Sequence, residues 1–185
     1  MLILASKSPR RRELLKMLDL EFKIMDLPGV EETYPSDLPA EKVPEFLSKI
    51  KAEAYTSYLN DEDILITADT VVIIDNDIIG KPKDLEDAKK MLSKLSGKQH
   101  RVVTGVSLTS TKKSVTFSSV TDVKFAHLSV EDIDFYVEKY KPLDKAGAYG
   151  IQEWIGAVGI EGIVGSFYNV MGLPIHALYK QLLLF

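Results

Sequence analysis

The chain has 185 residues and a formal net charge of −4, with 45% hydrophobic and 27% charged residues. This length suits one domain or two small lobes that bury roughly 70% of the unfolded surface. The acidic balance argues against a general nucleic-acid binder, which would carry a basic face. The absence of cysteine excludes disulfides, thiolate nucleophiles and cysteine metal sites.

The N-terminal segment, MLILASKSPRRRELL, holds an apolar run that is too short for a signal peptide. No apolar run elsewhere in the sequence approaches the length that crosses a membrane. The sequence therefore predicts a cytoplasmic protein that acts without a membrane or a nucleic-acid partner.

A cluster of basic residues follows the first predicted strand, at residues 2–5. Ser8 fits the N-cap, and Pro9 the first position, of a helix that continues to about residue 18. Its first turn contains three cations, each unfavourable there by about 0.3–1 kcal/mol; they are Arg10, Arg11 and Arg12. We therefore predict an anion held by backbone N–H groups, serine hydroxyls and guanidinium groups. A solvated basic helix start is the alternative.

A second strand, at residues 22–25, leads into a polar loop that contains Glu31 and Glu32. Acidic loop residues are usually solvated, so these two are weak candidates for metal ligands on their own. A helix is expected over residues 40–59, and Lys51 lies beside its apolar face. Lys51 either reaches into a cleft or lies along the apolar surface with its ammonium in water. The apolar face is formed by Val43, Phe46, Leu47, Ile50, Ala54 and Tyr58.

Polar residues interrupt the apolar segment ILITADTVVIIDNDIIGKP, residues 64–82. Its two dense apolar runs indicate a strand buried on both faces, yet Asp69 and Thr70 stand between them. An ionised carboxylate buried without a partner is costly, so it is normally paired or bound to metal. With Lys81 on the following Gly-Lys-Pro turn, these side chains suit a metal-bound phosphate. The alternative is that Asp69 caps a turn between two short strands.

The rest of the chain again mixes helices with strands, which predicts an α/β fold with a mixed, twisted sheet. We expect a helix capped by Asp84 and ended at Gly97, strands at residues 101–109 and 114–125, a helix from Ser129 to about residue 140, a strand at residues 155–164, a turn at residues 165–174 and a closing helix at residues 175–184. The apolar end of that last helix either forms an interface or completes the core.

A polar, glycine-containing segment at residues 144–152, DKAGAYGIQ, offers charge, an amide and close backbone approach to a ligand. Taken alone, it is weak evidence of a site. Neither of the glycine-rich phosphate-binding motifs, G-x-x-x-x-G-K-[ST] and G-x-G-x-x-G, is present. We interpret the histidines as structural because they lack metal-ligand spacing; they are His100, His127 and His176.

Six segments occur in order between Leu2 and Pro174: LASKSPRRRELL, ADTVV, GKP, LSGKQHRVVTGV, DKAGAYGIQ and GSFYNVMGLP. In order and spacing they resemble the Maf family of nucleoside triphosphate pyrophosphatases. The resemblance implies one Maf-like domain over residues 1–185, with two lobes around a cleft and the fold of the inosine triphosphate pyrophosphatases. It also implies hydrolysis of a nucleoside triphosphate to the monophosphate and pyrophosphate with a divalent cation, Mg²⁺ or Mn²⁺.

The DKAGAYGIQ segment resembles the family branch that acts on dTTP and UTP. The branch that acts on 7-methyl-GTP lacks the Tyr-Gly-Ile-Gln ending and is the alternative. The resemblance thus implies the removal of dTTP, UTP and modified pyrimidine nucleotides from the nucleotide pool. Glu153 and Trp154 stand where a glycine is common in the family, which puts the base pocket or its neighbouring loop in question.

We hypothesise roles for these residues in that reaction. Asp69 would be the base or the ligand of a metal-activated water, and the resemblance favours it as the catalytic residue; Glu32 is the candidate for the second metal carboxylate, with Glu31 as the fallback. Arg12 is expected to face solvent. The triphosphate would be held by Ser8, Arg10, Arg11, Lys51 and Lys81. The base would be read by Arg11, Thr70 and Gln152, whose amide offers both a donor and an acceptor.

Two other classes of protein remain open at this point. The first is a nucleotide-binding regulator with little turnover that acts through a protein partner in septum formation and cell division. The second is a structural protein whose basic helix is merely solvated. The family resemblance also allows a homodimer.

Overall fold

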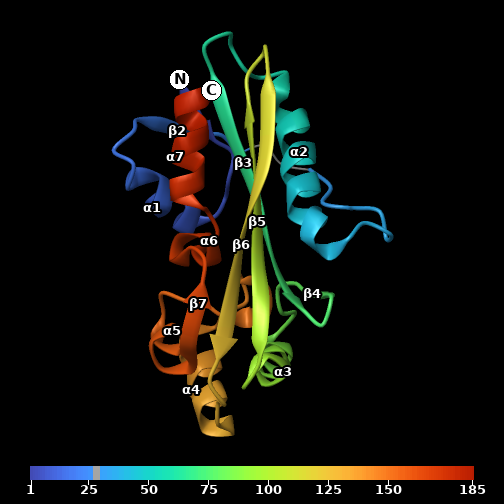
Figure 1. Cartoon of the computed structure of the whole chain (residues 1–185), viewed down its shortest axis with the longest axis vertical. Coiled ribbons are helices and arrows are strands. Elements are labelled where there is room, and N and C mark those ends of the chain that lie inside the picture. Colours follow the sequence, from blue (N-terminus) through green and yellow to red (C-terminus); the bar gives the residue numbers. More distant parts are fainter. Residues whose placement is uncertain (27–29) are drawn as a thin grey trace. The chain divides into compact units, whose positions relative to one another are not determined.

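The computed structural model describes residues 1–26 and 30–185, and seven strands in this part of the chain form one mixed sheet. The order is β2-β1-β3-β5-β6-β7, with β4 paired to β3 (Figure 1). β1 is parallel to β2 and β3, whereas β3–β4 and β6–β7 are antiparallel pairs. The strands are β1 (Leu2–Leu4), β2 (Phe22–Ile24), β3 (Ile64–Ile74), β4 (Asp77–Ile79), β5 (Gln99–Thr109), β6 (Ser114–Phe125) and β7 (Ile160–Val164). The predicted α/β class with a mixed sheet is confirmed.

The chain divides into two compact units. Unit 1 comprises Met1–Thr70, Thr104–Ser119 and Gly172–Phe185, and unit 2 comprises Val71–Val103 and Val120–Met171. The strands β3, β5 and β6 each contribute residues to both units. The expected single two-lobed domain over residues 1–185 stays a prediction.

Unit 1 packs helices on the strands that begin the sheet. Its helices are α1 (Pro9–Lys16), the short η1 (Ala40–Lys42), α2 (Val43–Thr56) and α7 (Ile175–Leu184). Leu2 pairs with Ile64 and Leu4 with Ile66, so the first residues of β3 lie beside β1. Gly105 of β5 lets α2 approach closely, because a Cβ there would lie 2.3 Å from the backbone nitrogen of Glu45.

The apolar face of α2 differs from the predicted one. The expectation that Ala54 and Tyr58 are buried is wrong: Ala54 is exposed, and Tyr58 is 59% exposed. α2 ends at Thr56, and the Tyr58 N–H donates to the Tyr55 carbonyl in a tighter turn. Tyr55 therefore enters the core in place of Tyr58, together with Ala52, and packs in a cluster with Leu65 of β3.

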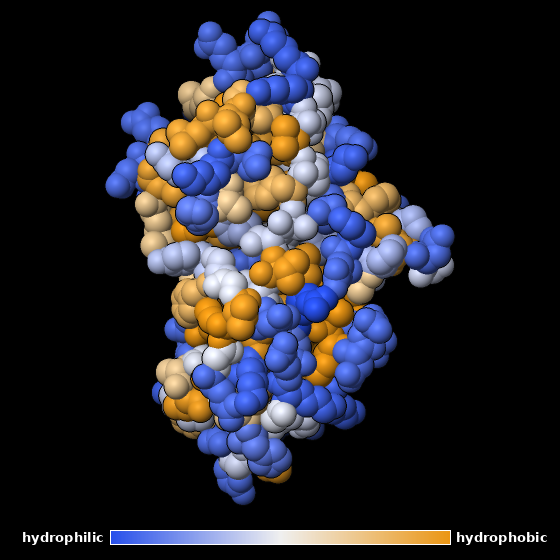
Figure 2. All heavy atoms as spheres, in the orientation of Figure 1, coloured by the Kyte–Doolittle hydropathy of each residue, from blue (hydrophilic) through white to orange (hydrophobic). Residues whose placement is uncertain are grey.

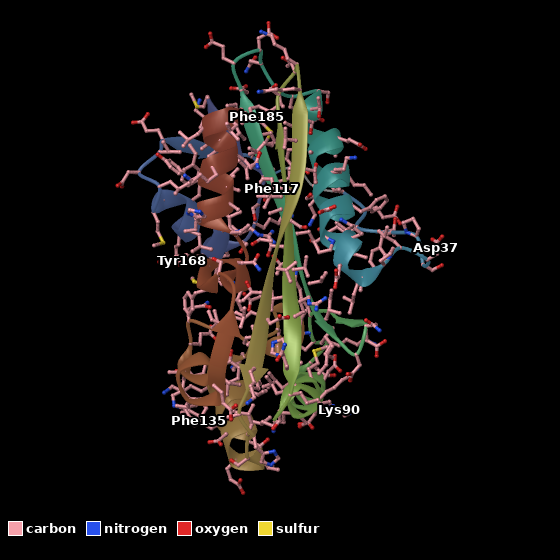
Figure 3. The ribbon with its side chains drawn as sticks, viewed as in Figure 1. Asp37, Lys90, Phe117, Phe135, Tyr168 and Phe185 are labelled. Carbon is pink, nitrogen blue, oxygen red and sulfur yellow. The ribbon has the colours of Figure 1, made fainter. Side chains whose placement is uncertain are left out.

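Unit 2 surrounds a larger apolar core. Its helices are α3 (Leu85–Leu95), α4 (Val130–Tyr140), the short η2 (Ala146–Ala148), α5 (Trp154–Gly159) and α6 (Phe167–Met171). The predicted caps are confirmed, because Asp84 accepts from the Asp87 N–H and Ser129 forms a capping box with Asp132. Phe135 of α4, labelled in Figure 3, packs edge-on against Trp154, with ring centroids 4.8 Å apart.

The expected strand at residues 155–164 is wrong in its first half, where the chain forms α5. Ile155 is 1% exposed and Val158 53% exposed, which is the one-sided burial of a helix. Gly156 permits this helix, because a Cβ at that position would lie 1.7 Å from the Ile151 carbonyl oxygen. The expected turn at residues 165–174 also contains a helix, α6, whose Asn169 N–H is bound by the Ser166 hydroxyl.

The closing helix α7 has the predicted bounds. Its apolar end does not complete the core, because Leu183 is 64% and Leu184 79% exposed, and apolar surface gathers at this end of α7 in Figure 2. Phe185 lies under the Lys113 ammonium, 4.3 Å from the ring centroid. The interface role and the homodimer stay predictions. In the described residues, no helix is long and apolar enough to cross a membrane.

Candidate active-site residues and family

Asp69 and Thr70 lie inside one continuous strand, so the alternative of a turn capped by Asp69 is wrong. β3 runs without a break from Ile64 to Ile74, and the neighbours Ala68 and Val71 are buried. Successive side chains of a strand point to opposite faces. Asp69 and Thr70 are both half-buried, and each contacts a different set of polar side chains.

Asp69 forms an ion pair with Lys51 of α2. Lys51 Nζ lies 2.7 Å from Asp69 Oδ1 and 3.1 Å from Glu32 Oε1. The side chains of Lys51 and Asp69 are only 14% and 13% exposed, whereas Glu32 is 54% exposed. The alternative that Lys51 lies along the apolar surface with its ammonium in water is therefore wrong, because the ammonium faces two carboxylates.

Thr70 contacts the guanidinium group of Arg11. Arg11 Nη2 donates to Thr70 Oγ1 at 3.0 Å, Nη1 to the Ala68 carbonyl at 2.9 Å, and Nε to the Gly172 carbonyl at 2.8 Å. Thr70 Oγ1 also lies 2.9 Å from Thr104 Oγ1. These bonds fix the plane and direction of the guanidinium, so for Arg11 the alternative of a solvated helix start is wrong.

The electrostatics of Arg11 connect it with the acidic pair. Burial lowers the pKa of the Arg11 guanidinium from its ordinary value. Asp69 and Glu32 act in the opposite direction on that pKa, and Arg10 lowers it further. Arginine nevertheless stays charged at neutral pH. Asp69, Glu32 and Arg10 therefore all act electrostatically on Arg11 within unit 1.

The start of α1 has the predicted form. Ser8 Oγ accepts from the Arg11 N–H at 3.4 Å, and the Ser8 N–H donates to Ser6 Oγ at 3.2 Å. Arg10 is half-buried. Arg12 does not simply face solvent as expected, because it is half-buried and its Nη2 donates to the Ser6 carbonyl at 3.2 Å.

Three contributors to this part of unit 1 were missed by sequence reasoning: Ser6, Thr104 and Gly172. Ser6 stands in the Ser-x-Ser-Pro sequence before α1, and the other two lie in LSGKQHRVVTGV and GSFYNVMGLP. Gly172 has a φ of +117°, which favours glycine. The sequence signal for Thr104 and Gly172 is therefore their place in those segments, because neither is near Arg11 along the chain.

Lys81 and Gln152 belong to unit 2. Lys81 follows β4 directly after Gly80, and both Lys81 and Gln152 are exposed. The Gly147 N–H donates to the Gly80 carbonyl at 3.0 Å. The turn that carries Lys81 is thus bonded to the segment that carries Gln152.

His100 is buried in unit 2, and its surroundings agree with a structural role. Its Nε2 lies 2.7 Å from the Tyr149 hydroxyl, and its ring packs edge-on against Phe125. Burial lowers the pKa of His100 to about 4. In the described residues, no group of three or more histidine, cysteine, aspartate or glutamate side chains could hold a metal ion.

Comparisons with known proteins place the chain in a family. A family model described as Maf-like protein matches residues 1–185. The dTTP/UTP pyrophosphatase of Phocaeicola vulgatus is 53% identical over 181 residues, which cover 98% of this chain and 94% of that protein. The dTTP/UTP pyrophosphatase of Porphyromonas gingivalis strain W83 is 55% identical over 183 residues, covering 98% and 92% of the two chains.

Among solved structures, the Ham1 protein of Staphylococcus aureus is similar in fold, with a TM-score of 0.50 and 18% sequence identity over 68% of this chain and 71% of that one. This likeness concerns the fold alone, and it confirms the expected fold class. The family model and the relatives extend over nearly every residue. The chain belongs to the Maf family.

Proposed function

We propose that this chain is a cytoplasmic pyrophosphatase that hydrolyses dTTP and UTP, and modified pyrimidine nucleotides, to the monophosphate and pyrophosphate. The observation that carries the proposal is the half-buried Asp69, which is paired with Lys51 and acts electrostatically on Arg11; Lys51 also pairs with Glu32. The relatives named dTTP/UTP pyrophosphatase support the choice of bases.

Hydrolysis between the α and β phosphates needs little covalent chemistry from a protein. It needs alignment of the substrate, neutralisation of its charge and a water molecule that can lose a proton. A carboxylate in the Asp69 position suits this last task, because it is held on a strand and still partly open to water. In the proposal, Asp69 accepts the proton of the attacking water or orients that water.

The residues of unit 1 fit a divalent cation. Asp69 and Glu32 supply carboxylate oxygens, the ligands that Mg²⁺ and Mn²⁺ take together with phosphate oxygens and water. The Lys51 ammonium already lies near both acids, which shows that the two carboxylates together favour a positive charge at this position. When bound there, the cation would neutralise phosphate charge and lower the pKa of a bound water.

The basic side chains and N–H donors named above would bind the negatively charged triphosphate. Ser8 and the N–H groups at the start of α1 offer donors to an anion. Arg10, Lys51 and Lys81 add positive charge in the proposal. In the described part of the chain, three of the five N–H donors of Arg11 are bound to the protein, so the guanidinium has a fixed direction in which it would meet a ligand.

The base would be read by Arg11, Thr70 and Gln152. Thr70 is held by Arg11 and Thr104, so its hydroxyl has a defined position. The Gln152 side chain is exposed, and its amide carries both a donor and an acceptor. Fixed groups of this kind discriminate bases by leaving buried polar atoms unpaired when the wrong base binds.

The test is pyrophosphate release from a panel of nucleoside and deoxynucleoside triphosphates, with and without Mg²⁺ or Mn²⁺. We expect metal-dependent release led by dTTP and UTP. Asp69→Asn should keep the fold and lower turnover at least about a hundredfold, whereas Asp77→Asn, at an exposed carboxylate bonded to Lys94, should leave turnover unchanged.

Each departure from this result has a definite meaning. Full activity of Asp69→Asn would remove this residue from the catalytic role. Release led by another base, such as 7-methyl-GTP, would overturn the assignment of the base. Tight binding of triphosphates without any release of pyrophosphate would show that the protein is a nucleotide-binding regulator of cell division and not an enzyme.

A further inference from the structure

A buried ion pair holds the ends of the segment that carries Gln152. Lys145 is 8% exposed, and its Nζ lies 3.1 Å from Glu153 Oε1 and 2.9 Å from Asp144 Oδ1. The other carboxylate oxygen of Glu153 accepts a hydrogen bond from the Tyr136 hydroxyl of α4. Glu153 therefore links both ends of the segment at residues 144–153 to one helix of unit 2.

The Tyr136 hydroxyl also binds the backbone of this segment. It accepts a hydrogen bond from the Gly150 N–H at 3.0 Å while it donates to Glu153. Tyr136 is fully buried, and burial raises the pKa of its phenol, as does the hydrogen bond to Glu153. The hydroxyl is therefore protonated at neutral pH and keeps both bonds.

Gly150 packs directly on the ion pair. A Cβ at this position would lie 3.0 Å from both Lys145 Cε and Glu153 Cδ. The Glu153 N–H donates to the Gly150 carbonyl at 3.0 Å. Gln152 stands between these two anchored residues, with its side chain exposed.

A fixed backbone matters for a glutamine that reads a pyrimidine. Thymine and uracil present an acceptor where cytosine presents an amino donor. A glutamine amide carries a donor and an acceptor side by side, so an amide that is free to rotate can satisfy either pattern. Discrimination therefore depends on holding the glutamine in one orientation, which starts with its backbone.

We propose that Glu153, together with Lys145 and Tyr136, is a positioning residue that holds Gln152 and so sets the preference for uracil and thymine over cytosine. None of the three contacts the base in this proposal. It rests on the proposed function, in which Gln152 reads the base. The carboxylate of Glu153 is what holds both Lys145 and Tyr136.

The test measures binding without turnover. Dissociation constants of α,β-imido-dUTP and α,β-imido-dCTP, determined by calorimetry with Mg²⁺, give the preference of each variant. We expect Tyr136→Phe and Glu153→Gln to lower the dUTP preference roughly tenfold, the size of a misplaced hydrogen bond.

Each variant has a control on α4: Tyr140→Phe removes a hydroxyl from the ring stacked on Tyr136, and Glu138→Gln alters an exposed carboxylate near Lys89. Both controls should keep the wild-type preference.

A double-mutant cycle separates positioning from a general loss of stability. In a Gln152→Ala background, Tyr136→Phe should change the preference no further, because the group that it positions is already absent. A structural role alone would lower the melting temperature and leave the ratio of the two dissociation constants unchanged.

The proposal is overturned by an unchanged preference in folded Glu153→Gln and Tyr136→Phe, by additive effects with Gln152→Ala, or by a wild-type protein that binds both analogues equally or not at all. If the protein hydrolyses dTTP and UTP but the variants keep the wild-type preference for dUTP over dCTP, only the positioning role is refuted. A Gln152-dependent preference in a protein without turnover would remove only the proposed catalysis.

Discussion

The Lys51 ammonium forms ion pairs with two carboxylates from different segments of unit 1. Asp69 belongs to β3, whereas Glu32 belongs to the polar loop before η1. The ammonium thus stands where a divalent cation would neutralise the same acids, and in the proposed site such a cation would compete with it for the two carboxylates. In the proposal, Lys51 would also offer its positive charge to the phosphates.

Lys51→Met should therefore have opposite effects on metal binding and on turnover. Without nucleotide, Mn²⁺ should bind more tightly, roughly tenfold or more, because the competing charge is gone. Turnover should fall, because a cation of the phosphate site is lost. Electron paramagnetic resonance of free Mn²⁺ measures the first effect, and pyrophosphate release the second.

Lys49→Met is the matched control, since Lys49 is an exposed lysine of the same helix. It should alter neither quantity. Weaker Mn²⁺ binding by Lys51→Met would show that Lys51 supports the metal instead of competing with it.

At the scale of single residues, the sequence indicated candidate residues through departures from ordinary patterns. A carboxylate inside an apolar strand and three arginines in the first turn of a helix are each costly without a partner. Those costs pointed to Asp69 and to the three arginines at the start of α1, of which Arg11 is one. The partners themselves were not predictable, because Arg11 binds residues that are 57, 59 and 161 positions away along the chain.

At the scale of elements, prediction succeeded where a local signal sets the boundary. Asp84 and Ser129 cap helices through bonds to residues three positions later, and such caps are visible in sequence. α5 was missed because its apolar, β-branched residues favour a strand. The helix depends on the close contact of Gly156 with the Ile151 carbonyl. The periodicity of the apolar residues does not reveal such a contact.

Gly156→Ala should consequently destabilise unit 2. The added Cβ would lie 1.7 Å from the Ile151 carbonyl oxygen, so the start of α5 must shift. We expect a loss of about 2 kcal/mol or more in the free energy of unfolding, measured in urea. Gly162→Ala on β7 is the control, because nothing lies within 4 Å of a Cβ there. Equal stabilities of the two variants would show that α5 is not constrained at Gly156.

At the scale of the whole molecule, the alternation of helices and strands predicted the fold class, and six ordered segments predicted the family. The division into units was beyond the sequence, because β3, β5 and β6 each continue as one strand from one unit to the other. The proposed site residues follow this division: Lys81 and Gln152 belong to unit 2, and the other seven belong to unit 1.

The stability of unit 2 should depend on pH through His100. Its pKa is about 4 in the folded protein and near the ordinary 6.5 when unfolded. Between these values the unfolded chain binds a proton that the folded chain does not, so stability is full above pH 6.5 and falls as the pH drops toward 4. The whole effect is roughly 3 kcal/mol.

Urea unfolding between pH 4.5 and 7.5 measures this dependence, and His100→Phe should flatten it, whatever its effect on stability at neutral pH. His176→Gln, at an exposed histidine of α7, should keep the wild-type slope. The same slope in His100→Phe would mean that other groups carry the acid sensitivity. A flattened slope would identify the buried pair of His100 and Tyr149 as its source, because protonation of His100 places a charge in the apolar core of unit 2.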